Sequence, residues 1–172
     1  MARKVELILS HWHHLFDGMQ ESTQQFYSQL EKAVNKRQIP DIKLSRVTYR
    51  EGGILTAKRE YFRVRRREHL FDVCAAPFAD SFFVSWWLGE APGFFLSLVM
   101  IIPFLGPFLL RVFRTQTYFR MDTTLMFQEL VHSAVIEVLE DMTKAKGIRA
   151  LSELERKPIF TSLFSKLKGD GE

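Results

Sequence analysis

Residues 42–66 read IKLSRVTYREGGILTAKREYFRVRR, and on both sides of the EGG sequence at 51–53 the side chains alternate between apolar and polar. Alternation with a period of two is typical of a β-strand that buries one face, and adjacent glycines favour a tight turn. The stretch therefore predicts two antiparallel strands, 42–50 and 54–66, joined by a short turn.

Three further strands are expected after this pair. Residues 70–75 and 80–88 are separated by Pro77, and the second segment is apolar on both faces. Such a strand is expected either at the centre of a sheet or against something other than water. Four short strands with tight turns predict an antiparallel meander over 42–90. The sequence TQTYFRM at 115–121 is expected to add a fifth strand.

Apolar residues at three- and four-residue steps predict long amphipathic helices on either side of these strands. One helix is expected over 5–37 and ends before Pro40. The clearer helix is expected over 123–145, with Asp122 as its N-cap. Short helices are expected over 151–168. The whole chain is thus predicted to form a single α+β domain, in which helices flank an antiparallel sheet of four to five strands.

The most unusual feature is the segment Ala91–Leu110, called the apolar run below, which reads APGFFLSLVMIIPFLGPFLL and contains no charge. One straight helix of this length would span about 30 Å, the thickness of a bilayer hydrocarbon core. However, Pro103 and Pro107 interrupt it, and an interior proline costs about 3 kcal/mol in a water-soluble helix. We therefore expect an apolar helical hairpin over 91–113, inserted between the last two strands.

The hairpin is expected to attach the protein to something else. Contact with a membrane, burial against another subunit and burial in the protein's own core all remain open at this point. A re-entrant hairpin is favoured because both flanking strands would then stay on one side of the membrane, with tryptophans and arginines near the headgroups. The predicted membrane or interface residues are Trp86, Trp87, Phe94, Phe95, Leu98, Ile101, Ile102, Phe104, Leu105, Phe108 and Leu109.

A basic strand face is a second candidate contact. Alternation places several arginines of one strand on the same face, which would suit anionic lipid headgroups. The alternative is a solvated face whose charges are partly paired by neighbouring glutamates. Nucleic-acid binding is disfavoured because no recognised fold or aromatic pattern accompanies the basic residues. The residues of the predicted basic patch are Arg59, Arg63, Arg65, Arg67, Arg111 and Arg114.

The sequence gives little support for metal or catalytic chemistry. Cys74 is the single cysteine, which excludes an intrachain disulfide and a multi-cysteine metal site. A helix-bundle site around His14, Glu129 and His132 is a minor hypothesis, since only one Glu-x-x-His pattern is present. The chain contains none of the common nucleophile, phosphate-loop or zinc motifs that we would expect of an enzyme. No metal and no cofactor are therefore expected.

These patterns together predict a non-enzymatic protein that associates with a membrane or assembles with itself. Its expected partners are a lipid surface and either further copies of the chain or another protein. The alternative is a soluble binding or scaffold subunit whose apolar hairpin is buried at an interface. Without a recognisable signal peptide, we expect a cytoplasmic protein that is peripheral or re-entrant at the inner face of a membrane.

Overall fold

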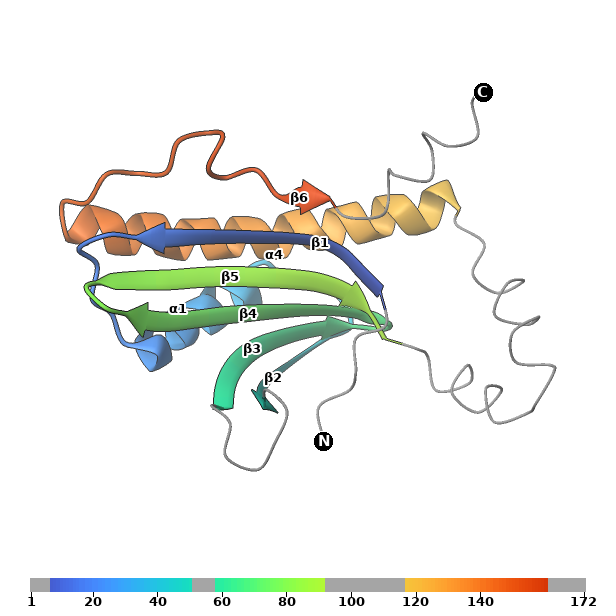
Figure 1. Ribbon diagram of the computed structural model, residues 1–172. Coiled ribbons are helices and arrows are strands. Elements are labelled where there is room, and N and C mark those ends of the chain that lie inside the picture. Colours follow the sequence, from blue (N-terminus) through green and yellow to red (C-terminus); the bar gives the residue numbers. More distant parts are fainter. Residues whose placement is uncertain (1–6, 51–57, 92–116, 161–172) are drawn as a thin grey trace, which may run out of the picture.

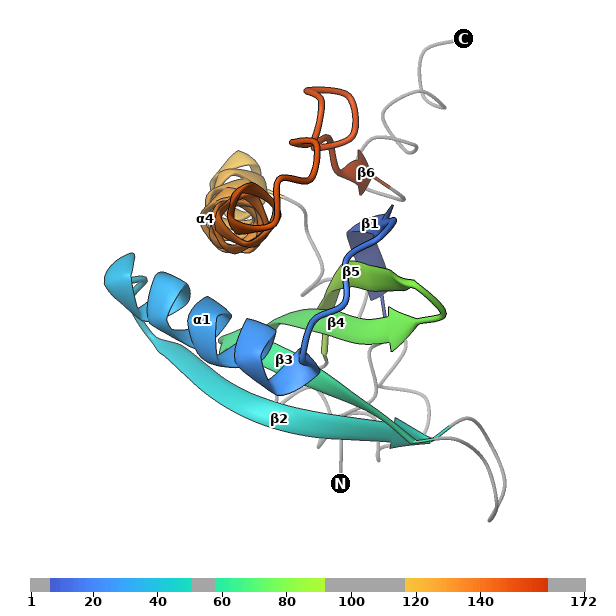
Figure 2. The ribbon, with the colours of Figure 1, turned by 90° about the vertical axis from the view of Figure 1, so that its left-hand side faces the viewer.

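The computed structural model describes residues 7–50, 58–91 and 117–160, which form a six-stranded antiparallel sheet and two helices. The strand order is β2-β3-β4-β5-β1-β6. Both helices lie on one side of the sheet, which curves around them (Figures 1 and 2). The α+β class and the antiparallel meander are therefore confirmed. The elements are β1 (Leu7–Phe16), α1 (Thr23–Lys36), β2 (Ile42–Arg50), β3 (Lys58–Arg66), β4 (His69–Phe78), β5 (Ser81–Glu90), α4 (Tyr118–Ala145) and β6 (Ile159–Phe160).

The core lies between the helices and the inner face of the sheet. Each helix buries residues at three- and four-residue steps, for example Phe26 and Leu30 of α1 and Phe127 and Val131 of α4. Large aromatic rings fill the centre, where the Trp86 and Phe71 ring centroids are 4.6 Å apart. The buried sheet residues that share this core include Trp12, Phe62, Val64, Phe71, Val73, Phe82, Val84, Trp86 and Leu88.

The long helix expected over 5–37 is wrong in its first part. Residues 7–16 form β1, which pairs with β5 from Leu7 opposite Glu90 to Phe16 opposite Phe82. The alternation of β1 is hidden because the polar Ser10 occupies an inward, buried position and because a register shift follows Ile8. The hydrogen bonds to β5, which run from Leu7 to Phe16, therefore outweighed the local helical pattern.

Two other predictions are corrected at the start of α4. The segment 115–121 is not a strand within the described residues, because α4 already begins at Tyr118. Its N-cap is Thr117, not Asp122, and the Thr117 side chain accepts a hydrogen bond from the Arg120 backbone N–H. The helix expected over 123–145 is confirmed as the greater part of α4.

The C-terminal helices expected over 151–168 are not found in the part that the structure describes. Residues 153–156 form turns, and Ile159 and Phe160 form β6 at the free edge of β1. The remaining residues, 161–168, lie outside the described residues. The long connection from α4 thus adds a short edge strand instead of a helix.

The register assigns each strand terminus to one of two ends of the sheet. We call one end the Glu90 end and the other the Phe78 end. The residues aligned across the Glu90 end are Leu7, Glu90, His69, Arg66 and Ile42. The Phe78 end holds Phe16, Ser81, Phe78 and Lys58. The two helices lie along the sheet between these ends (Figure 1).

Candidate functional site

The residues that flank segment 92–116 make contacts at the Glu90 end. Before the segment, the Ala91 backbone N–H donates to the Glu68 carbonyl oxygen at 2.9 Å. After it, the Arg120 guanidinium lies 3.2 Å from the Glu90 carboxylate and 3.6 Å from the Glu68 carboxylate. The chain therefore leaves β5 and enters α4 at one edge of the protein, as a hairpin excursion requires. The apolar run lies outside the described residues, apart from its first residue.

A buried polar cluster supports this junction. The Thr124 hydroxyl donates to the Arg120 carbonyl oxygen at 2.8 Å, so it accepts from His69 Nε2 at 2.9 Å. The same nitrogen lies 3.6 Å from the Glu90 carboxylate. Burial lowers the pKa of His69 below its ordinary value, which favours a neutral ring near pH 7. No pattern in the sequence indicates this cluster, because its members come from three separate elements.

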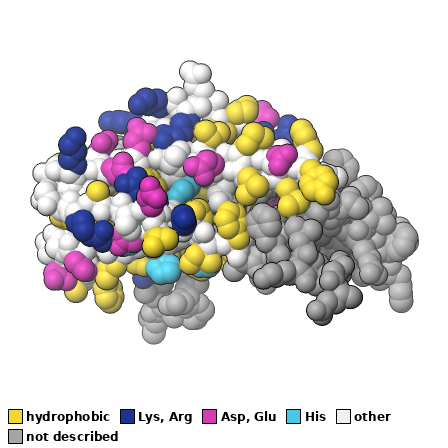
Figure 3. Space-filling model, turned by 90° about the horizontal axis from the view of Figure 1, so that it is seen from above, with side chains coloured by type: hydrophobic (Ala, Val, Ile, Leu, Met, Phe, Trp, Pro, Cys, Tyr) yellow, Lys and Arg dark blue, Asp and Glu magenta, His cyan; other side chains and the backbone are white. Residues whose placement is uncertain are grey.

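The first turns of α4 expose large apolar side chains beside the junction. Tyr118 is 87% exposed, Phe119 80% and Met126 59%. On the face seen in Figure 3, hydrophobic side chains gather toward the end of the molecule where α4 begins. Clustered exposed apolar groups are typical of contact surfaces. Among the described residues, no helix is both long enough and apolar enough to cross a membrane.

The two tryptophans predicted at the entrance of the apolar run have different surroundings. Trp86 is fully buried, and its indole N–H donates to His132 Nδ1 at 3.0 Å, so it belongs to the core. Trp87 faces the other side of the sheet, is 41% exposed and stacks on the His11 ring at 4.7 Å. The other predicted contact residues, from Phe94 to Leu109, lie outside the described residues.

The predicted arginines do not form one exposed patch. Arg63 is 5% exposed, and its guanidinium donates to both carboxylate oxygens of Asp72 at 2.6 Å. This side chain is therefore part of a buried ion pair and is not free to bind lipid. Arg59 lies toward the Phe78 end, whereas Arg65 and Arg67 lie at the Glu90 end. The two remaining arginines, Arg111 and Arg114, lie outside the described residues.

A small pocket opens on the outer face of the sheet beside this ion pair. Its volume is about 170 Å³, and Tyr49, Tyr61, Asp72 and Trp87 contribute to its lining. The Tyr49 hydroxyl donates to Asp72 and accepts from Arg63. Burial and the neighbouring carboxylate raise the pKa of Tyr49 to about 12. The Tyr49 hydroxyl and the Asp72 carboxylate are therefore already bonded to each other and to Arg63.

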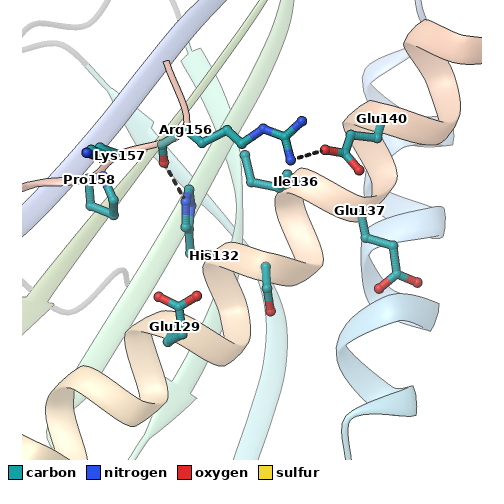
Figure 4. Close-up of a pocket in the computed structure, with 9 residues that line it drawn as sticks. Glu129, His132, Ile136, Glu137, Glu140, Arg156, Lys157 and Pro158 are labelled. Atoms are coloured by element: carbon teal, nitrogen blue, oxygen red, sulfur yellow. Dashed lines mark hydrogen bonds and ion pairs between the residues drawn. The ribbon is translucent and has the colours of Figure 1, made fainter. Parts of the chain in front are cut away.

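A larger groove of about 410 Å³ lies between α4 and residues 156–158 (Figure 4). His132 lies at its base, with Nδ1 accepting from Trp86 and Nε2 donating to the Arg156 carbonyl oxygen at 2.8 Å. The Arg156 guanidinium in turn pairs with Glu140. Both ring nitrogens are thus engaged, and burial lowers the pKa of the ring. In this arrangement His132 has a structural role.

The predicted helix-bundle site is not assembled. His14 lies on β1, where its ring stacks against Trp12, and not on a helix that faces α4. In the stretches that the structure describes, no three His, Cys, Asp or Glu side chains are grouped so that they could hold a metal ion. Cys74 is buried, which raises the pKa of its thiol.

Comparisons with known proteins add no family to this description. No protein-family model matches the sequence, and no curated protein or solved structure matches it.

Proposed function

We propose that this protein is a non-enzymatic attachment protein that docks on a membrane through the apolar run and through the basic residues at the Glu90 end of its sheet. The Glu90 end is the part of the molecule that meets the lipid, and the Phe78 end points away from it. Self-assembly on the membrane is part of the same proposal.

The observation that carries the proposal is the meeting of Glu90 and Arg120. Because this pair joins the residues that flank segment 92–116, the uncharged sequence of the apolar run can enter a bilayer and return without moving the sheet. A single span would need its two ends on opposite sides of about 30 Å of hydrocarbon. The contact between Glu90 and Arg120 therefore supports a re-entrant form over a single span.

The surroundings of the junction are consistent with a headgroup boundary. Tyr118 and Phe119 are exposed beside it, and aromatic side chains are favoured at membrane interfaces. Arg65 and Arg67 lie at the same end of the sheet. Apolar insertion and electrostatic attraction would then act on one surface, and two such signals bind a membrane more firmly than either alone.

Vesicle flotation of the full chain tests this function. The wild-type protein is expected to float with vesicles that contain anionic lipid, and Leu105→Glu is expected to remain in the dense fraction. Leu154→Glu is the matched control, because Leu154 is 78% exposed and far from the junction in sequence. A wild-type protein that remains soluble as a defined oligomer in the presence of vesicles would contradict the proposal and favour the scaffold alternative.

A further inference from the structure

We infer that Lys43, Arg65 and Arg67, called the basic corner below, form the site that binds the phosphate groups of anionic lipids. The inference rests on the proposed membrane docking and names the part of the basic face that gives it lipid selectivity. Lys43 was not among the residues predicted from the sequence. It is included because the strand register places it directly opposite Arg65.

The pairing of Lys43 with Arg65 is electrostatically unfavourable in the protein alone. Directly opposed residues of an antiparallel pair have their Cβ atoms about 5 Å apart, and like charges in such positions destabilise the sheet. The register and the alternation of side chains place both charges on the outer side of the β2–β3 pair, where Lys43 is exposed and Arg65 half-buried. A bound anion between them would replace this repulsion with two attractions.

The turn after β3 adds a third positive charge. Arg65 Nε donates to the Arg67 carbonyl oxygen at 3.0 Å, which holds the turn against the strand. Arg67 has φ +52°, a left-handed conformation that favours glycine. A long cationic side chain therefore occupies a position where glycine would be easier to accommodate. The presence of arginine at this position is explained if its positive charge is needed at the tip of the turn.

Acidic neighbours neutralise little of the corner. Among the ion pairs of the described residues, only Asp41 reaches it, at 3.6 Å from Arg67, and these two side chains are 65% and 63% exposed. Glu68, the next residue in the turn, lies 3.6 Å from Arg120 instead. The corner therefore keeps an excess of positive charge at the same end of the sheet as the junction of segment 92–116.

The experiment measures binding of the full chain to vesicles of phosphatidylcholine alone and to vesicles with added phosphatidylserine. Each basic residue near an anionic surface contributes about fivefold in affinity. We expect Lys43→Gln/Arg65→Gln to weaken binding to the anionic vesicles roughly 25-fold and to leave binding to phosphatidylcholine unchanged. Lys58→Gln/Arg59→Gln is the matched control, since it removes two exposed charges of β3 at the Phe78 end.

The outcomes separate this inference from the proposed function. Wild-type binding without a preference for phosphatidylserine, or equal losses in the two double variants, would overturn the basic corner and leave membrane docking intact. Absence of binding to either vesicle would overturn both. A titration with inorganic phosphate, without vesicles, distinguishes a lipid from a soluble ligand. If the protein binds phosphate tightly and Lys43→Gln/Arg65→Gln abolishes this binding, the basic corner is assigned to a soluble phosphorylated ligand instead of a lipid.

Discussion

The Arg120 guanidinium lies 3.2 Å from the Glu90 carboxylate, although 30 positions separate the two residues in the sequence. Glu90 is the last residue of β5 and Arg120 belongs to the first turn of α4. The pair joins the two points at which the chain leaves and re-enters the described structure. It therefore places the residues that flank segment 92–116 at one end of the sheet.

Removal of this contact is expected to destabilise the fold. In Arg120→Gln the Glu90 side chain, 11% exposed, loses its closest cation, which should lower the free energy of unfolding by about 1–3 kcal/mol. Urea unfolding followed by circular dichroism measures the change. Lys36→Gln is the control, because its ion pair with Glu137 is exposed and should contribute less than about 1 kcal/mol. Equal effects of the two substitutions would contradict the assigned role of Arg120.

The buried pair of Arg63 and Asp72 is expected to contribute more than any surface charge. Asp72→Asn leaves the guanidinium buried without its counter-charge, so unfolding should become easier by about 3–5 kcal/mol. Arg63→Leu/Asp72→Leu removes both charges and should recover much of this loss. Thermal and urea unfolding provide the comparison. A double variant that is less stable than Asp72→Asn would show that the pair is not a self-contained unit.

The buried histidines predict the pH dependence of stability. Burial lowers the pKa values of His69 and His132 in the folded protein, so below about pH 6.5 the unfolded chain takes up protons that the folded chain does not. Stability should therefore be highest above this pH and fall as the solution becomes acidic. Urea midpoints measured from pH 7.5 to pH 5 test the direction.

A substitution identifies the contribution of one ring. His132→Gln should reduce the pH dependence of stability, because glutamine has no ring nitrogen to take up the proton. In the wild-type protein this proton would displace the hydrogen bond that His132 accepts from Trp86. The exposed residue His13 supplies the control variant His13→Gln, which should retain the wild-type slope. An unchanged slope in His132→Gln would assign the acid sensitivity to other groups.

Two turn residues with left-handed backbone conformations allow the effect on stability to be distinguished from the effect on vesicle binding. Arg67 and Ala79 have φ values of +52° and +53° and lie in turns at opposite ends of the sheet. Glycine relieves a conformation that costs other residues about 1–2 kcal/mol, so Arg67→Gly and Ala79→Gly should both raise the unfolding temperature. Only Arg67→Gly should weaken binding to anionic vesicles. A loss of binding in both variants would point to the turns' rigidity instead of the charge.

The parts of the fold that were predictable from the sequence are those where a single period dominates. The alternation around 51–53 and the four-residue steps of 123–145 gave the meander and most of α4. β1 was missed because the inward Ser10 breaks its alternation, while Ile8, Trp12 and Leu15 happen to fit a helical spacing. The pairing of β1 with β5 joins segments that are distant in the sequence, so no local pattern predicts it.

The candidate site was less predictable for the same reason. The spacing of Arg63 and Arg65 predicts that they share one face of the strand. It does not predict that Arg63 is buried in an ion pair with Asp72 on the neighbouring strand. Likewise, the opposition of Lys43 and Arg65 depends on a register that the sequence leaves open. The apolar run is conspicuous in the sequence, whereas the contact that joins its two ends appears only after folding.

End-on docking is tested most directly by a fluorophore placed at each end of the sheet. With the lone cysteine removed by Cys74→Ala, an environment-sensitive dye can be attached in Phe119→Cys or in Phe78→Cys, at positions that are 80% and 69% exposed. On addition of anionic vesicles, the account predicts a blue shift and brighter emission from the dye at position 119 and no change at position 78. A response at position 78 alone, or equal responses at both positions, would contradict docking through the Glu90 end.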